Sequence, residues 1–171
     1  MKTSDRIFKL SDTLESESSG PLAQADGYLA LNMPEEAWNA LEEVPTAHEA
    51  DEPFLLKRVE IAIQWEKWEL GVMIANGALM LHPGGLDSYI AGAYCVRRYK
   101  SLEAAYEYLS KAEQDCVQLS PLWCYRMACY ESLLGHFDAV GAHLAKAVLF
   151  DEDLKNQSVA DEDLRAWFDL A

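Results

Sequence analysis

The sequence predicts an all-α protein made of about four consecutive antiparallel helical hairpins, and three observations lead there. Small and apolar residues recur at steps of 34, 34 and 35 positions through most of the 171 residues. Half of the chain is hydrophobic, which is ample for a buried core. Helix-starting and helix-ending residues fall between the apolar stretches. A repeat of this length, in which each unit is one helical hairpin, predicts units that stack on their neighbours.

Four sets of four residues keep the repeat spacing. In chain order they are Ala25, Val59, Ala93 and Ala128; Ala37, Gly71, Ala105 and Val140; Leu41, Ala75, Leu109 and Leu144; and Val44, Ala78, Ala112 and Ala147. A small side chain at a helix crossing lets two backbones approach closely, so we expect these positions to lie at helix–helix contacts.

Turn and cap residues set the limits of the expected elements. The first helices are predicted at 21–31, 53–65, 87–99 and 121–134, and the second helices at 34–44, 68–81, 102–116 and 137–149. Proline in the first turn favours the starts at Pro21, Pro34, Pro53 and Pro121, the last of these preceded by the capping residue Ser120. The Pro-Gly-Gly sequence at 83–85 ends the helix before it. The positions that open the second helices hold Pro34, Trp68, Leu102 and Phe137, and of these Trp68 and Phe137 are expected to be core contacts.

The 34-residue step, the small-residue spacing and the turn sequences at 100–105 and 133–137 resemble the tetratricopeptide repeat family, in particular its small stand-alone bacterial members. The resemblance covers about residues 18–150, with units at about 18–51, 52–85, 86–119 and 120–150. The family's turn glycine is present only at Gly135 and its closing proline only at Pro83. The resemblance implies a right-handed superhelical solenoid whose concave face, lined by the first helices, holds a partner protein.

The two ends lie outside this repeat. Residues 1–17 are expected to be either flexible or a short helix carrying Ile7, Phe8, Leu10 and Leu14. Residues 151–171 form an acidic C-terminal segment in which Leu164, Trp167 and Phe168 make one stripe at helical spacing. A solenoid needs its last unit covered, so 161–169 is expected to be a capping helix; the alternative is a partner-binding tail.

Charge and composition exclude several classes of function. The net charge is −15, and both flanks are acidic: residues 1–52 carry 12 acids and 3 bases, and residues 151–171 carry 7 and 2. Nucleic-acid binding needs clustered positive charge and is therefore not expected. No apolar run reaches the ~18 residues of a membrane span, and no secretory signal is evident. The four cysteines form no CxxC pair, so we expect reduced thiols in a cytoplasmic protein.

A search for catalytic chemistry finds no constellation with the required spacing. His48, His82, His136 and His143 are scattered, and the last two are seven residues apart across a turn, so no helical metal pair exists. There is no nucleophile elbow, phosphate-binding glycine loop or HExxH motif. The expected function is therefore non-catalytic protein–protein interaction as an adaptor, without metal or cofactor.

Matching the family's groove positions to this sequence gives the candidate partner-binding residues. They are Asp26, Lys57, Glu60, Tyr94, Arg97, Arg98, Tyr125, Arg126 and Cys129. Arginine and tyrosine are enriched at binding hot spots, so Arg97 and Arg98 beside the two tyrosines suggest an acidic, partly aromatic peptide ligand. The alternative is that these two arginines pair with Glu131, Glu103 or water on an ordinary solvated helix.

Two other functions remain open at this point. One is a secretion-type chaperone that cradles an extended segment of its client. The other is a self-associating scaffold, a homo-oligomer whose copies dock through a shared apolar seam. The residues expected in that seam are Leu22, Leu29, Leu56, Ile63 and Ile90.

Overall fold

The computed structural model describes residues 19–170, and this part of the chain is helical throughout, without strands. The helices are α1 Ser19–Ala30, α2 Pro34–Ala40, α3 Glu52–Gln64, α4 Trp68–Leu81, α5 Leu86–Tyr99, α6 Leu102–Ser110, α7 Ala112–Asp115, α8 Pro121–Leu134, α9 Phe137–Phe150, α10 Glu152–Ala160 and α11 Arg165–Phe168. Short 3₁₀ turns occur at Leu41–Glu43 (η1), Thr46–His48 (η2) and Glu162–Leu164 (η3). None of these helices is both long and apolar enough to cross a membrane.

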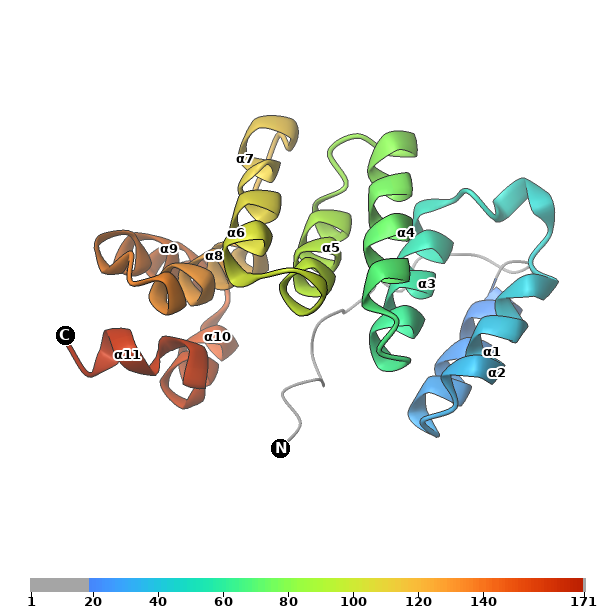
Figure 1. Ribbon diagram of the computed structural model, residues 1–171, viewed down its shortest axis with the longest axis horizontal. Coiled ribbons are helices and arrows are strands. Elements are labelled where there is room, and N and C mark those ends of the chain that lie inside the picture. The colour runs from blue at the N-terminus through green and yellow to red at the C-terminus, as the bar shows by residue number, and fades with distance from the viewer. Residues whose placement is uncertain (1–18, 171) are drawn as a thin grey trace.

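The helices pack as consecutive antiparallel pairs, which confirms the predicted all-α class. The pairs are α1–α2, α3–α4, α5–α6 and α8–α9, and they follow one another along the long axis of the molecule (Figure 1). Each pair also contacts the next, both through its second helix and through its first, so that α1 touches α3, α3 touches α5 and α5 touches α8. The first helices therefore have neighbours on more sides than the second helices do.

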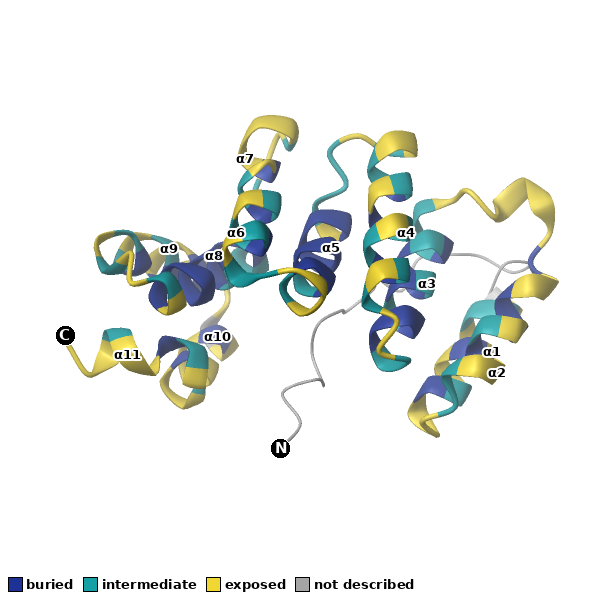
Figure 2. Ribbon diagram, in the orientation of Figure 1, coloured by how far each residue is buried: buried dark blue, intermediate teal, exposed yellow. Residues whose placement is uncertain are grey.

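Burial follows from this arrangement. The helices α3, α5 and α8 bury residues around most of their circumference, whereas α4 and α6 keep exposed outer faces (Figure 2). All members of the four repeated sets are buried, including Gly71, whose missing side chain leaves room for Cys95. The core is divided into three adjacent clusters along the row, the largest of which joins α5, α6, α8 and α9 to Leu154 and Leu164 of the C-terminal segment.

Helix caps explain several of the observed starts. The Ser120 hydroxyl accepts a hydrogen bond from the Trp123 backbone N–H at 3.1 Å, as the sequence predicted for the start of α8. Ser101 caps α6 in the same way, through the N–H of Ala104 at 3.1 Å. These caps satisfy amide groups that the first turn of a helix leaves without partners.

Three sequence expectations about the helices were wrong in detail. The helix expected at 34–44 ends at Ala40 and continues as the 3₁₀ turn η1, and the helix expected at 102–116 is divided at Lys111 into α6 and α7. The C-terminal segment holds a further helix, α10, before the expected cap, and the cap itself consists of η3 followed by the short α11. The prediction for residues 1–17 lies outside the described residues.

Three of the four turns inside the helix pairs use a left-handed residue at equivalent positions. Asn32, Glu66 and Gly135 have φ of 59°, 57° and 77°, and they are separated by the repeat step, with Lys100 as the fourth member at φ −121°. Glycine takes this conformation freely, and asparagine takes it more easily than glutamate. The backbone at Glu66 therefore carries strain that the turn at Gly135 lacks.

Replacing Glu66 with glycine is expected to raise the free energy of unfolding by about 0.5–1 kcal/mol, because relief of the left-handed strain outweighs the entropy that glycine adds to the unfolded chain. The matched variant Asn32→Gly changes the equivalent turn, where the original residue tolerates this conformation. Its free energy of unfolding should therefore rise less. Urea denaturation of both variants measures the difference. Equal or lower stability of Glu66→Gly would show that this turn is not strained.

Candidate partner-binding site

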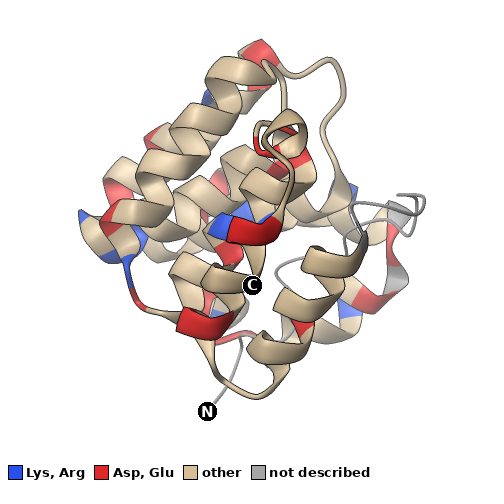
Figure 3. Cartoon of the chain, turned by 90° about the vertical axis from the view of Figure 1, so that its right-hand side faces the viewer, with Lys and Arg blue, Asp and Glu red and all other residues tan. Residues whose placement is uncertain are grey.

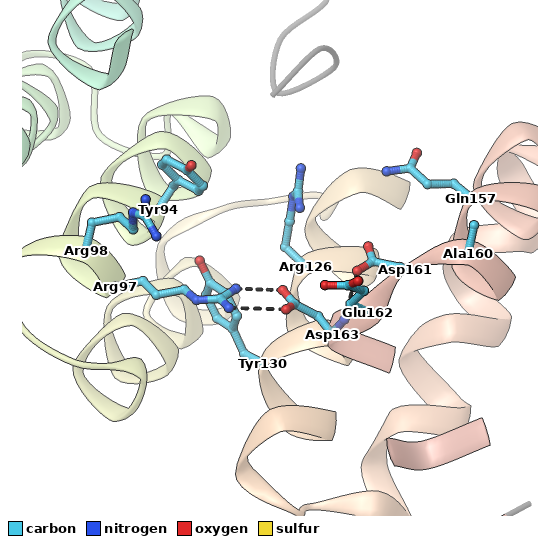
Figure 4. A pocket seen from close by; sticks show the side chains of 10 residues that line it. All are labelled: Tyr94, Arg97, Arg98, Arg126, Tyr130, Gln157, Ala160, Asp161, Glu162 and Asp163. Carbon is cyan, nitrogen blue, oxygen red and sulfur yellow. Dashed lines mark hydrogen bonds and ion pairs between the residues drawn. The ribbon is translucent and has the colours of Figure 1, made fainter. Parts of the chain in front are cut away.

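A pocket of about 340 Å³ opens between α5, α8 and the C-terminal segment. Three helical regions far apart in the sequence supply its walls (Figure 4). The lining residues are Tyr94, Arg97 and Arg98 from α5, Arg126 and Tyr130 from α8, and Gln157, Ala160, Asp161, Glu162 and Asp163 from α10 and the start of η3. Three arginines thus meet three carboxylates around one opening.

The helix period places the basic and aromatic residues on the pocket side. Tyr94, Arg97 and Arg98 are spaced i, i+3 and i+4 on α5, and Arg126 and Tyr130 are spaced i and i+4 on α8. Residues at these spacings lie on one face of a helix. Because α5 packs directly on α8, the two faces meet and form one arginine–tyrosine surface, which consists of these five residues.

Arg97 is held by an ion pair with Asp163. Its Nη1 and Nη2 atoms donate to the two carboxylate oxygens at 2.6 and 3.2 Å, and its guanidinium lies over the Tyr130 ring at 5.7 Å. The hydrogen bonds to Asp163 raise the pKa of Arg97 above its ordinary value. Burial raises the pKa of Tyr130, so the ring that supports Arg97 is a neutral phenol. Both partners of the ion pair keep some solvent access, at 31% for Arg97 and 25% for Asp163.

Asp161 fixes the start of η3 against α8. Its carboxylate accepts hydrogen bonds from the Tyr125 hydroxyl at 2.7 Å and from the Asp163 backbone N–H at 3.0 Å, and the Cys129 thiol lies 3.9 Å away. Burial is the main cause that raises the pKa of Tyr125, and the hydrogen bond to Asp161 adds to it. The tyrosine therefore stays protonated and remains a donor to the carboxylate. Asp161 consequently has a structural role that its place in the pocket lining does not reveal.

Arg98 and Arg126 differ from Arg97, because within residues 19–170 neither has a carboxylate partner at ion-pair distance. The Arg98 guanidinium lies over the Trp68 ring at 5.2 Å, and Trp68 in turn meets Tyr94 edge to face at 6.1 Å. Arg126 lies over the Tyr125 ring at 5.9 Å, and its side chain rises between Tyr94 and Gln157 (Figure 4). These stacked aromatic rings hold two guanidinium groups at the pocket without neutralising them.

The remaining candidate residues, Asp26, Lys57 and Glu60, form a separate cluster between α1 and α3. The Lys57 ammonium donates to Asp26 at 2.6 Å and to Glu60 at 2.5 Å, and Lys57 is only 6% exposed. Burial lowers the pKa of Lys57, but the two hydrogen bonds and the charges of both carboxylates outweigh it, so the pKa lies above its ordinary value. This lysine ties two helix pairs together and does not line the pocket.

The structure corrects other expectations about the candidate site. Tyr125 and Cys129 are completely buried, so neither side chain is on the molecular surface. Arg97 pairs with Asp163 and not with Glu131 or Glu103; Glu131 is bound instead by His143 at 2.8 Å.

The apolar seam expected for self-association is also not an exposed surface. Four of its five members are buried among the helices, namely Leu29, Leu56, Ile63 and Ile90, while Leu22 is half-buried.

Several pocket residues were missed by the sequence reasoning, namely Tyr130, Gln157, Ala160, Asp161, Glu162 and Asp163. Trp68 was expected only as a core residue, yet it is half-buried and supports Arg98 at the edge of the site. The acidic triplet at 161–163 was visible in the sequence, but its distance from α5 along the chain gave no indication that it returns to Arg97.

The chain carries 29 acidic and 14 basic residues. Acidic positions are spread over many helices, and basic ones are fewer (Figure 3). In the part of the chain that the structure describes, no group of three or more His, Cys, Asp or Glu residues is arranged to hold a metal ion.

Comparison with known proteins gives no family: no protein-family model matches the sequence, and neither does any curated protein.

Proposed function

We propose that the protein is a non-catalytic interaction module of the tetratricopeptide type, which holds an acidic segment of a partner protein at the arginine–tyrosine surface. The observation that carries the proposal is the pair of arginines, Arg98 and Arg126, which face one pocket without a carboxylate partner among the described residues. In a chain with a net charge of −15, two such guanidinium groups at one pocket favour a negatively charged ligand.

The tetratricopeptide assignment is supported by the burial of all four repeated sets and by the way in which the helix pairs pack. Contacts from first helix to first helix, together with contacts from each second helix to the next first helix, are what a right-handed superhelical array of hairpins requires. In such an array α1, α3, α5 and α8 line the inner face, and the pocket residues Tyr94 and Arg126 belong to two of these helices.

The chemistry of the pocket suggests an acidic segment that also carries an aromatic or amide group. Guanidinium groups bind carboxylates through directed, charge-assisted hydrogen bonds, and their stacking on Trp68 and Tyr125 limits the freedom that binding would otherwise cost. Tyr94 offers an aromatic edge beside them, and Gln157 offers both a donor and an acceptor on the opposite wall. A segment lying between these walls meets Arg98 and Arg126 on one side, and Gln157 together with the acidic residues 161–163 on the other.

The double variant Arg98→Glu with Arg126→Glu is expected to abolish this binding. Loss of charge-assisted hydrogen bonds, worth about 1.5–3 kcal/mol each, corresponds to at least about tenfold per arginine. The measurement is fluorescence anisotropy with an array of labelled ten-residue peptides rich in glutamate and tyrosine, each compared with its glutamine counterpart. Lys146→Glu with Arg165→Glu is the matched control, because it changes the charge equally at exposed positions outside the pocket. The same affinity in both double variants would refute the proposed site.

A further inference from the structure

The acidic triplet Asp161–Asp163 already presents carboxylates to the surface proposed for the ligand. Asp163 binds Arg97 in the two-pronged geometry that a ligand carboxylate would use, and Arg97 lines the same pocket as Arg98 and Arg126. Glu162 lies beside it on the pocket wall, as Figure 4 shows. One of the three pocket arginines is therefore occupied by a group of the chain itself.

We infer that the site is regulated within the chain: the Asp163 carboxylate occupies Arg97, and an acidic ligand competes with it for that arginine. This inference rests on the proposed function, because it takes the ligand to be acidic. It adds that the free protein holds its site partly neutralised and that full binding requires one internal ion pair to open. Poorly charged segments cannot replace Asp163 at Arg97 and would bind weakly.

The geometry allows such an exchange without unfolding the C-terminal segment. Asp163 and Arg97 are both partly exposed, and an ion pair with solvent access is readily exchanged. The next residue, Leu164, is completely buried, and the carboxylate of Asp161 is held by Tyr125 and by the Asp163 backbone N–H. Asp161 and Leu164 therefore anchor η3, while the Asp163 side chain is free to rotate away from Arg97.

A substitution at Asp163 separates this competition from a simple change of charge. In Asp163→Asn the side chain keeps its size but loses the ion pair, so the affinity for the glutamate-rich peptide is expected to rise about two- to fivefold. Glu162→Gln is the matched control: it removes the same charge from the same pocket wall and leaves the Arg97–Asp163 pair intact. The inference requires that Asp163→Asn raises the affinity for the peptide clearly more than Glu162→Gln does at equal salt concentration.

A second measurement uses the unaltered chain. The Arg97 side-chain Nε–H signal, followed by NMR while the same peptide is added, should shift in parallel with the Arg98 and Arg126 signals, because all three arginines then bind the ligand. An Arg97 signal that stays fixed at saturation, or equal gains for Asp163→Asn and Glu162→Gln, would overturn the inference. If Arg98 and Arg126 still prove essential in that case, the proposed function stands without it. If no peptide binds through them, both fail.

Discussion

Replacement of Trp123 by alanine is expected to lower the free energy of unfolding by about 3–5 kcal/mol, the range observed when a large aromatic residue is removed from a core. Trp123 is 1% exposed, and its indole N–H donates to the Leu109 carbonyl oxygen of α6 at 3.1 Å. Its ring also meets His143 of α9 at 5.6 Å, nearly perpendicular. One side chain on α8 thus links its own pair to the preceding one, and its loss leaves a cavity and removes the hydrogen bond between α8 and α6.

Urea denaturation followed by circular dichroism measures this effect. Comparison with Trp123→Phe separates the loss of packing from the loss of the hydrogen bond. Phenylalanine keeps most of the apolar contact but cannot donate to the Leu109 carbonyl oxygen. We expect the phenylalanine variant to lie between the original protein and the alanine variant. A loss below about 1 kcal/mol for Trp123→Ala would mean that α6, α8 and α9 do not share a close-packed core at this position.

The helical class and the pairing of helices could be predicted because their signals are local or periodic. The step from Ala25 through Val59 and Ala93 to Ala128 marked positions that are all buried, since a small residue at a helix crossing is required wherever two backbones come close. The start of α8 at Pro121 followed from a serine–proline cap. The cap depends on residues a few positions apart and the repeat on a constant spacing, and a sequence displays both directly.

Helix ends were predicted less well, because the same residue types suit either outcome. Nothing in the sequence distinguishes the 3₁₀ turn at Leu41 from another turn of α-helix, and Lys111 is an acceptable helix former where α6 in fact stops. Both ends lie against the core: Leu41 is buried in one cluster with Phe54 and Ile61, and the Leu109 carbonyl, two residues before Lys111, accepts the Trp123 indole N–H. Contacts of this kind lie outside the few residues that a helix-end signal covers.

Of the candidate site, the sequence predicted only residues on α5 and α8 and none in the C-terminal segment. Arg97, Arg98 and Arg126 were identified from the family resemblance, and all three line the pocket. The burial of Tyr125 beneath η3 was not foreseen, because it results from a contact between residues 125 and 161 across a chain reversal. The C-terminal cap thus covers part of the surface that the sequence had assigned to a partner, and only three-dimensional contacts show which part.

A second large loss of stability is expected from a substitution in the C-terminal cap, which consists of η3 and α11. Leu164→Ala is expected to reduce the free energy of unfolding by about 2–5 kcal/mol, because Leu164 is completely buried in the cluster that includes α8 and α9. The same change should loosen η3 and uncover Cys129, a fully buried thiol whose pKa burial raises above its ordinary value. Reaction with a thiol reagent at neutral pH should therefore be faster in this variant than in the original protein.

Leu170→Ala is the matched control for this change, since Leu170 is 71% exposed and its removal should alter stability by less than about 0.5 kcal/mol. The comparison also separates two roles of adjacent residues. If Leu164 anchors η3 while Asp163 only occupies Arg97, Leu164→Ala destabilises the fold and Asp163→Asn barely does. Equal, large losses of stability from both would instead make Arg97–Asp163 part of the cap, and the site would then be closed by the same contacts that hold the last helix pair together.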